Sequence, residues 1–414
     1  MVTRVYIYEN YGKIVTMEKL FEQYRRLIQH TELNVTRSLE GQISWDARLI
    51  GIKGSRGTGK TTLLLQHIKK TFADNLKTAL YVSLDNLWFF NNTLTDLADY
   101  FVKHGGMYLF LDEVHKYPSW DREIKNLYDG YPELHIVFTG SSLLEILAAR
   151  VDLSRRALVY VLPGLSFREF LEIKTGEKFP VLELQDILKH HEKLAEDIVK
   201  KTKPLVFFND YLNYGYYPFF LEGEKDYFQR LGEIVLMILE QELPLMKMIE
   251  PAYVPKVKQL LAIISQSVPF IPNISKLSER IGINRQTFLT YLQYLQQAKL
   301  ILLLYKEGSG ISTLQRPDKI FLDNTSLMYL LGENHPNIGN LRETFLANQL
   351  SMKHSIRYSE KSDFLVDDTY TIEVGGKNKN GKQLDGLIHA YIAADDIEFG
   401  FGNKIPLWLF GCMY

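Results

Sequence analysis

The sequence contains a single cysteine, Cys412, among 414 residues. One thiol excludes an internal disulfide framework and any zinc site built from cysteines. Long apolar runs are also missing: Leu300–Tyr305 has the length of a strand, far from the ~20 residues that cross a bilayer. The first 22 residues alternate apolar with polar and charged side chains and lack the apolar core of a secretion signal. We therefore expect a cytoplasmic protein without membrane attachment.

An excess of charge of either sign is missing as well. The chain has 48 lysines and arginines against 49 aspartates and glutamates, a net charge of −1. This balance predicts no strong overall attraction to nucleic acid or to a membrane surface, and it leaves a local patch open. The length exceeds what one hydrophobic core usually serves, so we expect several domains.

Residues 54–61 form a glycine-rich stretch with the pattern Gly-x-x-x-x-Gly-Lys-Thr, between a strand pattern and a helical pattern. Its glycines let backbone N–H groups converge on a phosphate, and the following helix adds its dipole. Lys60 brings a positive charge to the β and γ oxygens, and the Thr61 hydroxyl can bind Mg²⁺. The sequence predicts a nucleoside triphosphate site formed by Gly54, Ser55, Arg56, Gly57, Thr58, Gly59, Lys60, Thr61 and Thr62.

A second motif supplies the carboxylates that such a site needs. The apolar run 107–111 is followed directly by Asp112 and Glu113. A carboxylate at the carboxyl end of a buried strand can hold Mg²⁺, and its neighbour can polarise the water that attacks the γ-phosphate. We assign the first role to Asp112 and the second to Glu113.

Hydroxyls end the next strand pattern, residues 135–142. Thr139 or Ser141 can contact the lytic water or the γ-phosphate, while Ser142 can instead cap a helix over 142–149. Arg155 and Arg156 follow. Either one can neutralise charge on the γ-phosphate as an arginine finger, in cis or from a neighbouring subunit, or can simply pair with surface carboxylates.

Taken in order, the loop 54–61, the acidic strand end 109–113, the hydroxyl strand end 137–142, Ser154-Arg155-Arg156 and the segment Leu162–Phe170 resemble a family of prokaryotic AAA-type (AAA+) ATPases. Members of this family carry an additional C-terminal domain whose role is largely uncharacterised. The resemblance implies ATP as the nucleotide, Mg²⁺ as its metal and hydrolysis on an AAA-type core. It does not identify the use of the energy.

Short apolar runs alternate with helical patterns from about residue 46 to 175, which predicts an α/β P-loop NTPase core with a parallel sheet. Each run is apolar almost throughout, as expected for strands covered on both faces. The expected strands are Leu49–Lys53, Ala79–Leu84, Tyr108–Asp112, His135–Thr139 and Leu158–Leu162. The expected domains are an N-terminal helical segment (1–45), the AAA-type core (46–175), a helical lid (176–265), a winged helix (266–335) and a small α/β nuclease-like domain (336–414).

The winged-helix prediction rests on a helix, a turn at Gly282, a second helix and a strand at 300–305. Asn284, Arg285 and Gln286 stand at the start of the second helix, where such modules contact DNA. The alternative is a module that only packs against the rest of the protein.

The last unit places Glu343 on a helix and Asp363 and Glu373 on or beside strands, the order found in PD-(D/E)xK nucleases. The lysine expected two residues after the last acid is replaced by Gly375, and Lys377 lies two residues further on. We therefore expect a nuclease-like scaffold without activity.

From these observations we expect Mg²⁺-dependent ATP hydrolysis that drives a conformational switch acting on a protein partner. The alternatives are a DNA-associated ATPase that uses the winged helix and an ATP-gated nuclease with a degenerate site. A homo-oligomer is compatible with the sequence, which sets neither the oligomeric state nor the partner.

Overall fold

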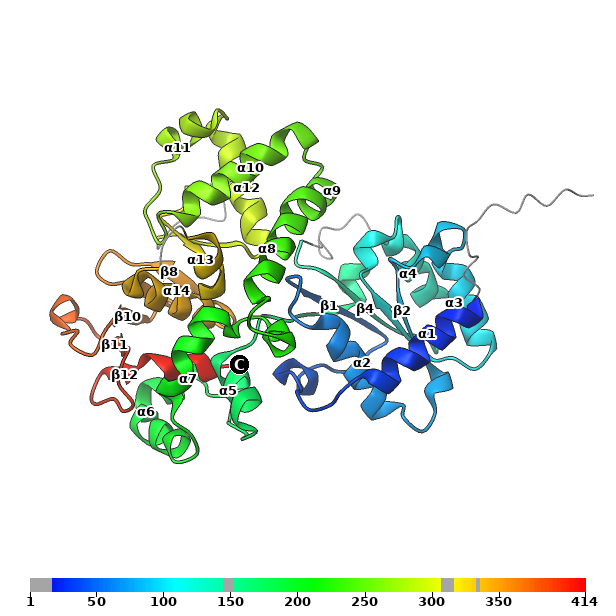
Figure 1. Ribbon diagram of the computed structural model, residues 1–414, viewed down its shortest axis with the longest axis horizontal. Coiled ribbons are helices and arrows are strands. Elements are labelled where there is room, and N and C mark those ends of the chain that lie inside the picture. The colour runs from blue at the N-terminus through cyan, green and yellow to red at the C-terminus, as the bar shows by residue number, and fades with distance from the viewer. Residues whose placement is uncertain (1–16, 144–151, 307–315, 333–335) are drawn as a thin grey trace, which may run out of the picture.

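The first part of the protein is built on a five-stranded parallel sheet, seen in blue and cyan in Figure 1, with strand order β2-β3-β4-β1-β5. The computed structural model describes residues 17–143, 152–306, 316–332 and 336–414. All five strands predicted from the sequence are confirmed, each end within two residues: β1 (Leu49–Gly54), β2 (Ala79–Ser83), β3 (Tyr108–Asp112), β4 (His135–Ser141) and β5 (Leu158–Val161).

Four helices flank this sheet: α1 (Met17–His30), α2 (Lys60–Thr71), α3 (Leu94–Lys103) and α4 (Trp120–Gly130). α1 packs against α2 and β2, whereas α3 packs against α4, which lies on β4. The connection from β1 to β2 crosses the sheet in one direction, and the connections from β2 through β3 to β4 return in the other. Because each crossover between parallel strands is right-handed, the connecting helices of the two directions lie on opposite faces of the sheet. Within the expected N-terminal helical segment (1–45), α1 ends at His30, and residues 38–41 form a separate 3₁₀ turn.

The second part begins with helices, in agreement with the helical lid predicted over residues 176–265. Two π-helical turns, Tyr211–Gly215 and Ile238–Glu242, interrupt or join them. The helices are α5 (Phe167–Thr175), α6 (Leu184–Val199), α7 (Pro204–Asp210), α8 (Tyr227–Met237), α9 (Leu243–Lys247) and α10 (Val254–Ser265).

A helix, a left-handed turn at Gly282 and a second helix follow, in the predicted order. A two-stranded antiparallel sheet closes this stretch, and Phe270 forms a bridge to its second strand. Residues 284–286 are exposed at the start of the second helix. The elements are α11 (Ile274–Ile281), α12 (Arg285–Gln297), β6 (Ile301–Leu304), β7 (Lys319–Leu322) and α13 (Thr325–Leu331).

The C-terminal stretch forms a five-stranded mixed sheet with order β12-β11-β10-β9-β8. β8, β9 and β10 pair antiparallel, whereas β10, β11 and β12 pair parallel. The sequence suggests one long buried strand over 405–410, and this prediction is wrong. The strand stops at Pro406, which has no N–H for the ladder, and Leu407–Cys412 form a buried 3₁₀ helix. The elements are α14 (Ile338–Ser351), β8 (Ile356–Tyr358), β9 (Phe364–Val366), β10 (Tyr370–Gly375), β11 (Ala390–Ala394) and β12 (Lys404–Pro406).

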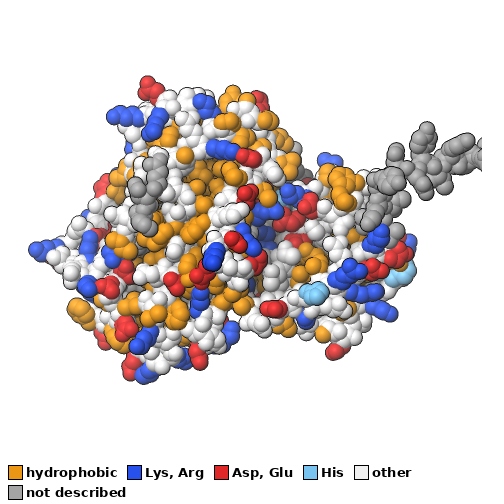
Figure 2. Space-filling model, viewed as in Figure 1, with side chains coloured by type: hydrophobic (Ala, Val, Ile, Leu, Met, Phe, Trp, Pro, Cys, Tyr) orange, Lys and Arg blue, Asp and Glu red, His pale blue; other side chains and the backbone are white. Residues whose placement is uncertain are grey.

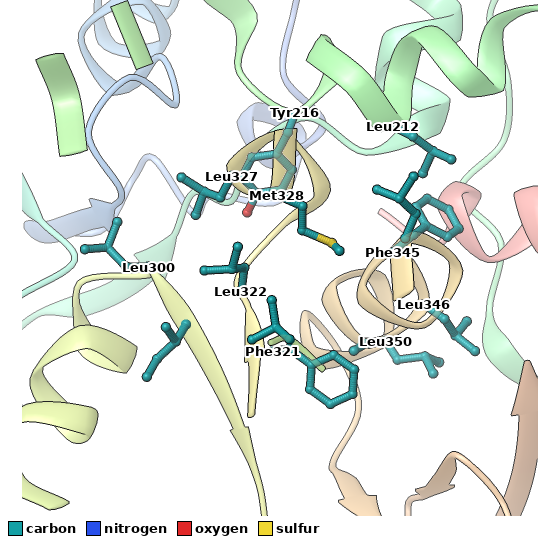
Figure 3. Close-up of a cluster of buried hydrophobic side chains, with 14 of the residues drawn as sticks. Leu212, Tyr216, Leu300, Phe321, Leu322, Leu327, Met328, Phe345, Leu346 and Leu350 are labelled. Atoms are coloured by element: carbon teal, nitrogen blue, oxygen red, sulfur yellow. The ribbon is translucent and has the colours of Figure 1, made fainter. Parts of the chain in front are cut away.

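One hydrophobic cluster runs through the second part, from Leu165 to Met413. Figure 3 shows Tyr216, Leu300, Leu327 and Phe345 converging in it, although they come from the three stretches expected to be separate domains. The predicted lid, winged helix and C-terminal unit therefore share one core. The domain boundaries at residues 265 and 335 stay predictions.

Lys, Arg, Asp and Glu side chains are interspersed over the face in Figure 2, in keeping with the balanced net charge. Within the described ranges, no helix is both long enough and apolar enough to cross a membrane.

Candidate functional site

The glycine-rich loop connects β1 to α2 at the carboxyl edge of the parallel sheet. Gly57 and Gly59 have φ values of 82° and 92°, in the left-handed region that glycine reaches without a steric penalty. A Cβ on Gly54 would collide with the carbonyl oxygen of Leu162, which is the residue after β5. The loop therefore requires glycine for its turn at two positions and for close backbone approach at a third.

Lys60 is the first residue of α2, and its side chain turns back into the loop. Its Nζ lies 2.9 Å from the carbonyl oxygens of both Gly54 and Ser55, and the residue is only 6% exposed. Burial lowers the pKa of this ammonium, an effect that Glu113 and Asp112 oppose. The predicted phosphate-binding lysine thus lies among the predicted carboxylates.

Asp112 ends β3 beside the start of α2. Its Oδ2 accepts hydrogen bonds from the Thr61 hydroxyl at 2.6 Å and from the Tyr81 phenol at 2.8 Å, and its Oδ1 accepts one from Thr139. The two residues predicted to bind Mg²⁺ are therefore in contact. Hydroxyl and carboxylate oxygens are the hard ligands that this ion prefers, so the donor set fits it.

Glu113 directly follows β3 in a left-handed conformation, with φ of 54°. Such a conformation is unfavourable for a residue with a side chain, and it is frequent at functional sites. Its Oε2 lies 3.3 Å from Nε2 of His115 and 3.8 Å from Nη1 of Arg56. Burial raises the pKa of the Glu113 carboxyl; Lys60 lowers it and Asp112 raises it further. Burial also lowers the pKa of His115 to about 4, so this imidazole is neutral near pH 7.

The structure separates the two predicted hydroxyls of β4. Thr139 is buried and touches the site directly, because its Oγ1 contacts Asp112 and accepts a hydrogen bond from the backbone N–H of Glu113 at 3.2 Å. Ser141 instead donates to Glu242 of the second part, at 2.6 Å. The predicted helix over 142–149 lies outside the described residues.

Arg155 and Arg156 are not brought to this site within one chain. They precede β5, whose first residue, Leu158, pairs with Ile50 near the amino end of β1, whereas the loop follows the carboxyl end of β1. Arg156 pairs with Asp129 at 3.1 Å. The expectation that either arginine acts in cis is therefore wrong, because parallel strands place the two at opposite edges of the sheet. A role from a neighbouring copy stays a prediction.

Four contacts at the site have no counterpart in the sequence predictions: those of Tyr81, His115, Arg56 and Glu242. His115 follows the acidic pair by two residues, a spacing that could have suggested it. The motif predicts Arg56 only as part of the phosphate loop, whereas the fold also places its guanidinium beside Glu113. Glu242 lies in a helical region with no local motif, and only the folded chain brings it here.

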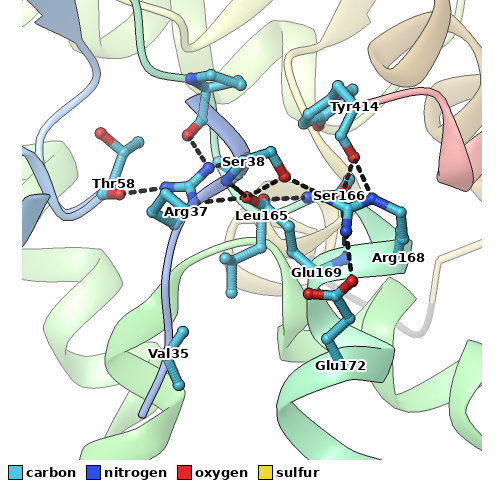
Figure 4. A network of polar contacts seen from close by, with 12 residues as sticks. Val35, Arg37, Ser38, Thr58, Leu165, Ser166, Arg168, Glu169, Glu172 and Tyr414 are labelled. Carbon is cyan, nitrogen blue, oxygen red and sulfur yellow. Dashed lines mark hydrogen bonds and ion pairs between the residues drawn. The ribbon is translucent and has the colours of Figure 1, made fainter. Parts of the chain in front are cut away.

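A second polar network, centred on Arg37, holds the backbone of the phosphate loop (Figure 4). Arg37, 6% exposed, donates to the Glu169 carboxylate at 3.1 Å and to the carbonyl oxygens of Thr58, Pro163 and Gly164 at 2.6, 2.9 and 2.9 Å. Burial raises the pKa of Glu169, but Arg37, the backbone N–H of Ser38 and Arg168 together outweigh it, and the net shift is downward. One guanidinium thus joins the phosphate loop to the first helix of the second part.

The Leu162–Phe170 segment therefore has a structural role in the network. Ser166 and Glu169 form a capping box at the start of α5, and Glu169 also accepts from the backbone N–H of Ser38 at 2.8 Å. Ser166 and Arg168 both donate to the carbonyl oxygen of Tyr414, at 2.6 and 3.1 Å. The network joins the N-terminal segment, the loop and the last described residue.

Each of the three acids of the C-terminal unit lies beside a lysine. Lys319 pairs with Glu343 at 2.6 Å and lies 3.8 Å from Asp363, while Lys379 pairs with Glu373 at 2.5 Å. Among the described residues, no group of three acidic, histidine or cysteine side chains is placed so that it could hold a metal ion. The nuclease-like scaffold without activity stays a prediction.

Lys377, the residue considered as a replacement for the missing lysine, points elsewhere. It pairs with Asp396 at the surface, at 2.9 Å. Lys379 reaches Glu373 instead, because the chain turns back after Gly375 so that a Cβ at Gly375 would meet the Lys379 side chain.

Comparisons with known families agree with this geometry. Residues 46–171 match a family model described as an AAA domain, and residues 207–337 match a domain of unknown function, DUF8612. The family match and the strand order together give residues 46–171 an AAA-type P-loop fold.

The chain is similar to two uncharacterised proteins of Methanocaldococcus jannaschii. One is 27% identical over 388 residues, which cover 86% of this chain and 81% of the relative; the other is 25% identical over 268 residues, which cover 61% and 55%. Among solved structures, AMPPCP-bound DnaA from Aquifex aeolicus is similar at 14% identity, covering 69% of this chain and 90% of that chain, with a TM-score of 0.25. A RuvB variant of Thermotoga maritima gives 13% identity, 70% and 90% coverage, and a TM-score of 0.26.

Proposed function

We propose that this protein binds ATP with Mg²⁺ at the loop between β1 and α2 and hydrolyses it to ADP and phosphate. One observation carries the proposal: Lys60, Thr61, Asp112 and Glu113 converge at the carboxyl edge of the sheet, in mutual contact or close to it. Each has the chemistry that its role needs. The AAA domain match supports ATP as the nucleotide.

In this mechanism, the loop N–H groups and Lys60 hold the β- and γ-phosphates. Thr61 and Asp112 would hold Mg²⁺, which neutralises charge on the phosphate oxygens when bound. Glu113 orients a water molecule and accepts its proton as the water oxygen bonds to the γ-phosphorus. The bond from that phosphorus to the bridging oxygen breaks, ADP leaves with the oxygen, and the proton ends on the released phosphate. Thr139, which accepts a hydrogen bond from the Glu113 backbone, would report the γ-phosphate to the end of β3.

We further propose that the cycle acts on a protein partner. The net charge of −1 gives no overall attraction to nucleic acid, and Phe90, Met248 and Ile388 are each 81% exposed, as contact residues for another protein would be. Turnover measured with and without duplex DNA tests this choice. Arg285 is exposed at the start of α12. If DNA stimulates turnover and replacing Arg285 abolishes the stimulation, the DNA-associated alternative is favoured.

Replacing Lys60 with Ala is expected to weaken ATP binding by at least ten- to a hundredfold. A charge-assisted hydrogen bond contributes about 1.5–3 kcal/mol, and Lys60 is the buried cation of the loop. Isothermal titration calorimetry of the purified variant measures the loss. Lys70→Ala, at the exposed end of the same helix, is the matched control and should bind ATP as the wild type does. Unchanged affinity in Lys60→Ala would contradict the proposed site.

Turnover is expected to fall on acidification with an apparent pKa above 4.5, the ordinary value for a glutamate. Burial raises the pKa of Glu113, so its carboxylate takes up a proton at higher pH than an exposed one, and only the ionised form can accept a proton from water. A kcat profile from pH 4.5 to 8.5, with circular dichroism to confirm that the protein stays folded, measures this acidic decrease in turnover. Constant kcat down to pH 4.5 would exclude Glu113 as the base.

A further inference from the structure

The strongest unexplained feature of the molecule is a buried carboxylate that reaches the phosphate loop from the second part. Glu242 ends the π-helical turn between α8 and α9 and is 2% exposed. Its Oε1 lies 3.2 Å from Nη1 of Arg56 in the loop, and its Oε2 accepts a hydrogen bond from the Ser141 hydroxyl at 2.6 Å. Neither the motifs nor the proposed hydrolysis uses it.

The position of Glu242 is that of a competitor for the γ-phosphate. Arg56 also approaches Glu113, the residue assigned to the attacking water, and Ser141 lies two residues beyond Thr139 on the same strand. The charge of Glu242 also acts on Lys60 and raises its pKa. A buried carboxylate among other carboxylates is unfavourable unless it is paired. Arg56 and Ser141 supply that pairing, and a γ-phosphate entering here would need the same two groups.

Apolar contacts also hold the helix that leads to Glu242 against the phosphate loop. A Cβ on Gly57 would come within 3.0 Å of the side chains of Phe219 and Ile234, so both lie against the loop. Ile234 belongs to α8, which leads directly into the turn that ends at Glu242. Release of the carboxylate would therefore loosen α8 and the following helix from the loop.

On the basis of the ATP site proposed above, we propose that Glu242 determines how the protein responds to the γ-phosphate. Without a γ-phosphate, the carboxylate holds Arg56 and Ser141 and keeps α8 seated on the loop. The γ-phosphate repels Glu242 and takes both partners, so ATP releases the second part. ADP ends at the β-phosphate, which the loop N–H groups and Lys60 hold, and it leaves the contact of Glu242 intact.

This device lowers the apparent affinity for ATP, because ATP must displace the carboxylate before it can bind fully. Glu242→Gln keeps the size and a hydrogen-bonding group but removes the charge. We expect this variant to bind a non-hydrolysable ATP analogue about tenfold or more tightly than the wild type, with ADP affinity changed by less than about twofold. Glu240→Gln, two residues away and paired with Lys258 at the surface, is the matched control and should change neither affinity.

Isothermal titration calorimetry of the full chain with the analogue and with ADP measures the four affinities. If the wild type binds the analogue but Glu242→Gln shifts both nucleotides equally or neither, the role of Glu242 is wrong and the ATP site stands. If the wild type binds neither nucleotide, both proposals fail.

Hydrogen exchange gives a second readout that does not depend on the variant. In the wild type, the analogue should raise amide exchange over residues 234–247 at least threefold, whereas ADP should leave it unchanged. In Glu242→Gln the same segment should exchange faster without any nucleotide. Equal protection of this segment with the analogue and with ADP would overturn the proposal.

Discussion

Glu113→Gln is expected to lower ATP turnover by about 10²- to 10⁴-fold, the range that a positioned general base contributes. The amide keeps the size of the side chain and can still lie beside His115 and Arg56, but it cannot accept a proton from water. ATP binding depends on the loop and Lys60, so affinity should stay within about twofold of the wild type. The variant should therefore hold ATP without cleaving it.

Single-turnover assays with excess enzyme separate cleavage from product release and measure this loss directly. Glu133→Gln, an exposed residue in the turn before β4, is the matched control and should retain wild-type turnover. Normal turnover in Glu113→Gln would assign the proton to another group. A variant that also loses ATP affinity would show that Glu113 contributes to binding rather than to the chemical step alone.

The catalytic half of this site could be predicted because its geometry follows from strand order. Parallel strands end at one edge of a sheet, so the residues after β1, β3 and β4 must meet there. Lys60, Asp112, Glu113 and Thr139 each occupy such an end, and spacing along the chain was enough to place them. The same argument, applied to β5, would have excluded Arg155, which precedes its strand rather than following it.

Contacts between the two parts of the molecule could not be predicted in this way. Glu242 and Arg56 are far apart in sequence, and their pairing depends on how helices pack on a loop, which no periodic pattern encodes. The same holds for Arg37 and Glu169. Lys379 was missed for a local reason, since two glycines let the chain reverse after β10 and bring back a lysine that strand spacing would place too far away.

The fold shows a similar division. The ends of buried strands such as β1 and β4 agree with the prediction to within two residues, because burial on both faces leaves a mostly apolar run. The three-residue strands β8 and β12 are too short to leave such a run, so no apolar pattern marks them in the sequence. The apolar segment after Pro406 shows the limit, because burial alone does not distinguish a strand from a 3₁₀ helix.

Arg37→Ala is expected to destabilise the protein by about 3–5 kcal/mol, the range for removing one partner of a buried ion pair. The substitution leaves the Glu169 carboxylate, 4% exposed, without its cation. It also removes the donors to the carbonyl oxygens of Thr58 and Gly164, so the phosphate loop and the start of α5 lose their connection. Equilibrium urea unfolding followed by tryptophan fluorescence measures the change, since Trp88 reports the first core and Trp408 the second.

Two further variants separate the ion pair from a general effect of removing a cation. Arg37→Lys keeps the charge but cannot reach the carboxylate and three carbonyl oxygens from one planar group, so an intermediate loss is expected. Lys103→Ala breaks an exposed pair with Asp99 and should leave the unfolding midpoint unchanged. A midpoint equal to that of the wild type in Arg37→Ala would show that Glu169 is held by Ser38 and the capping box alone.

The difference in unfolding free energy between the wild type and Arg37→Ala should depend on pH, and this dependence distinguishes a charge effect from lost packing. In the wild type, the pKa of Glu169 lies below its ordinary value of 4.5, so the ion pair contributes its full stability above that pH and loses it as pH falls through the folded-state value. Arg37→Ala removes the cation that lowers the pKa of Glu169, so burial, which raises that pKa, is less strongly opposed. The gap in unfolding free energy between the two proteins should therefore narrow on acidification below about pH 5. A gap that stays constant over this range would assign the role of Arg37 to its carbonyl contacts rather than to its charge.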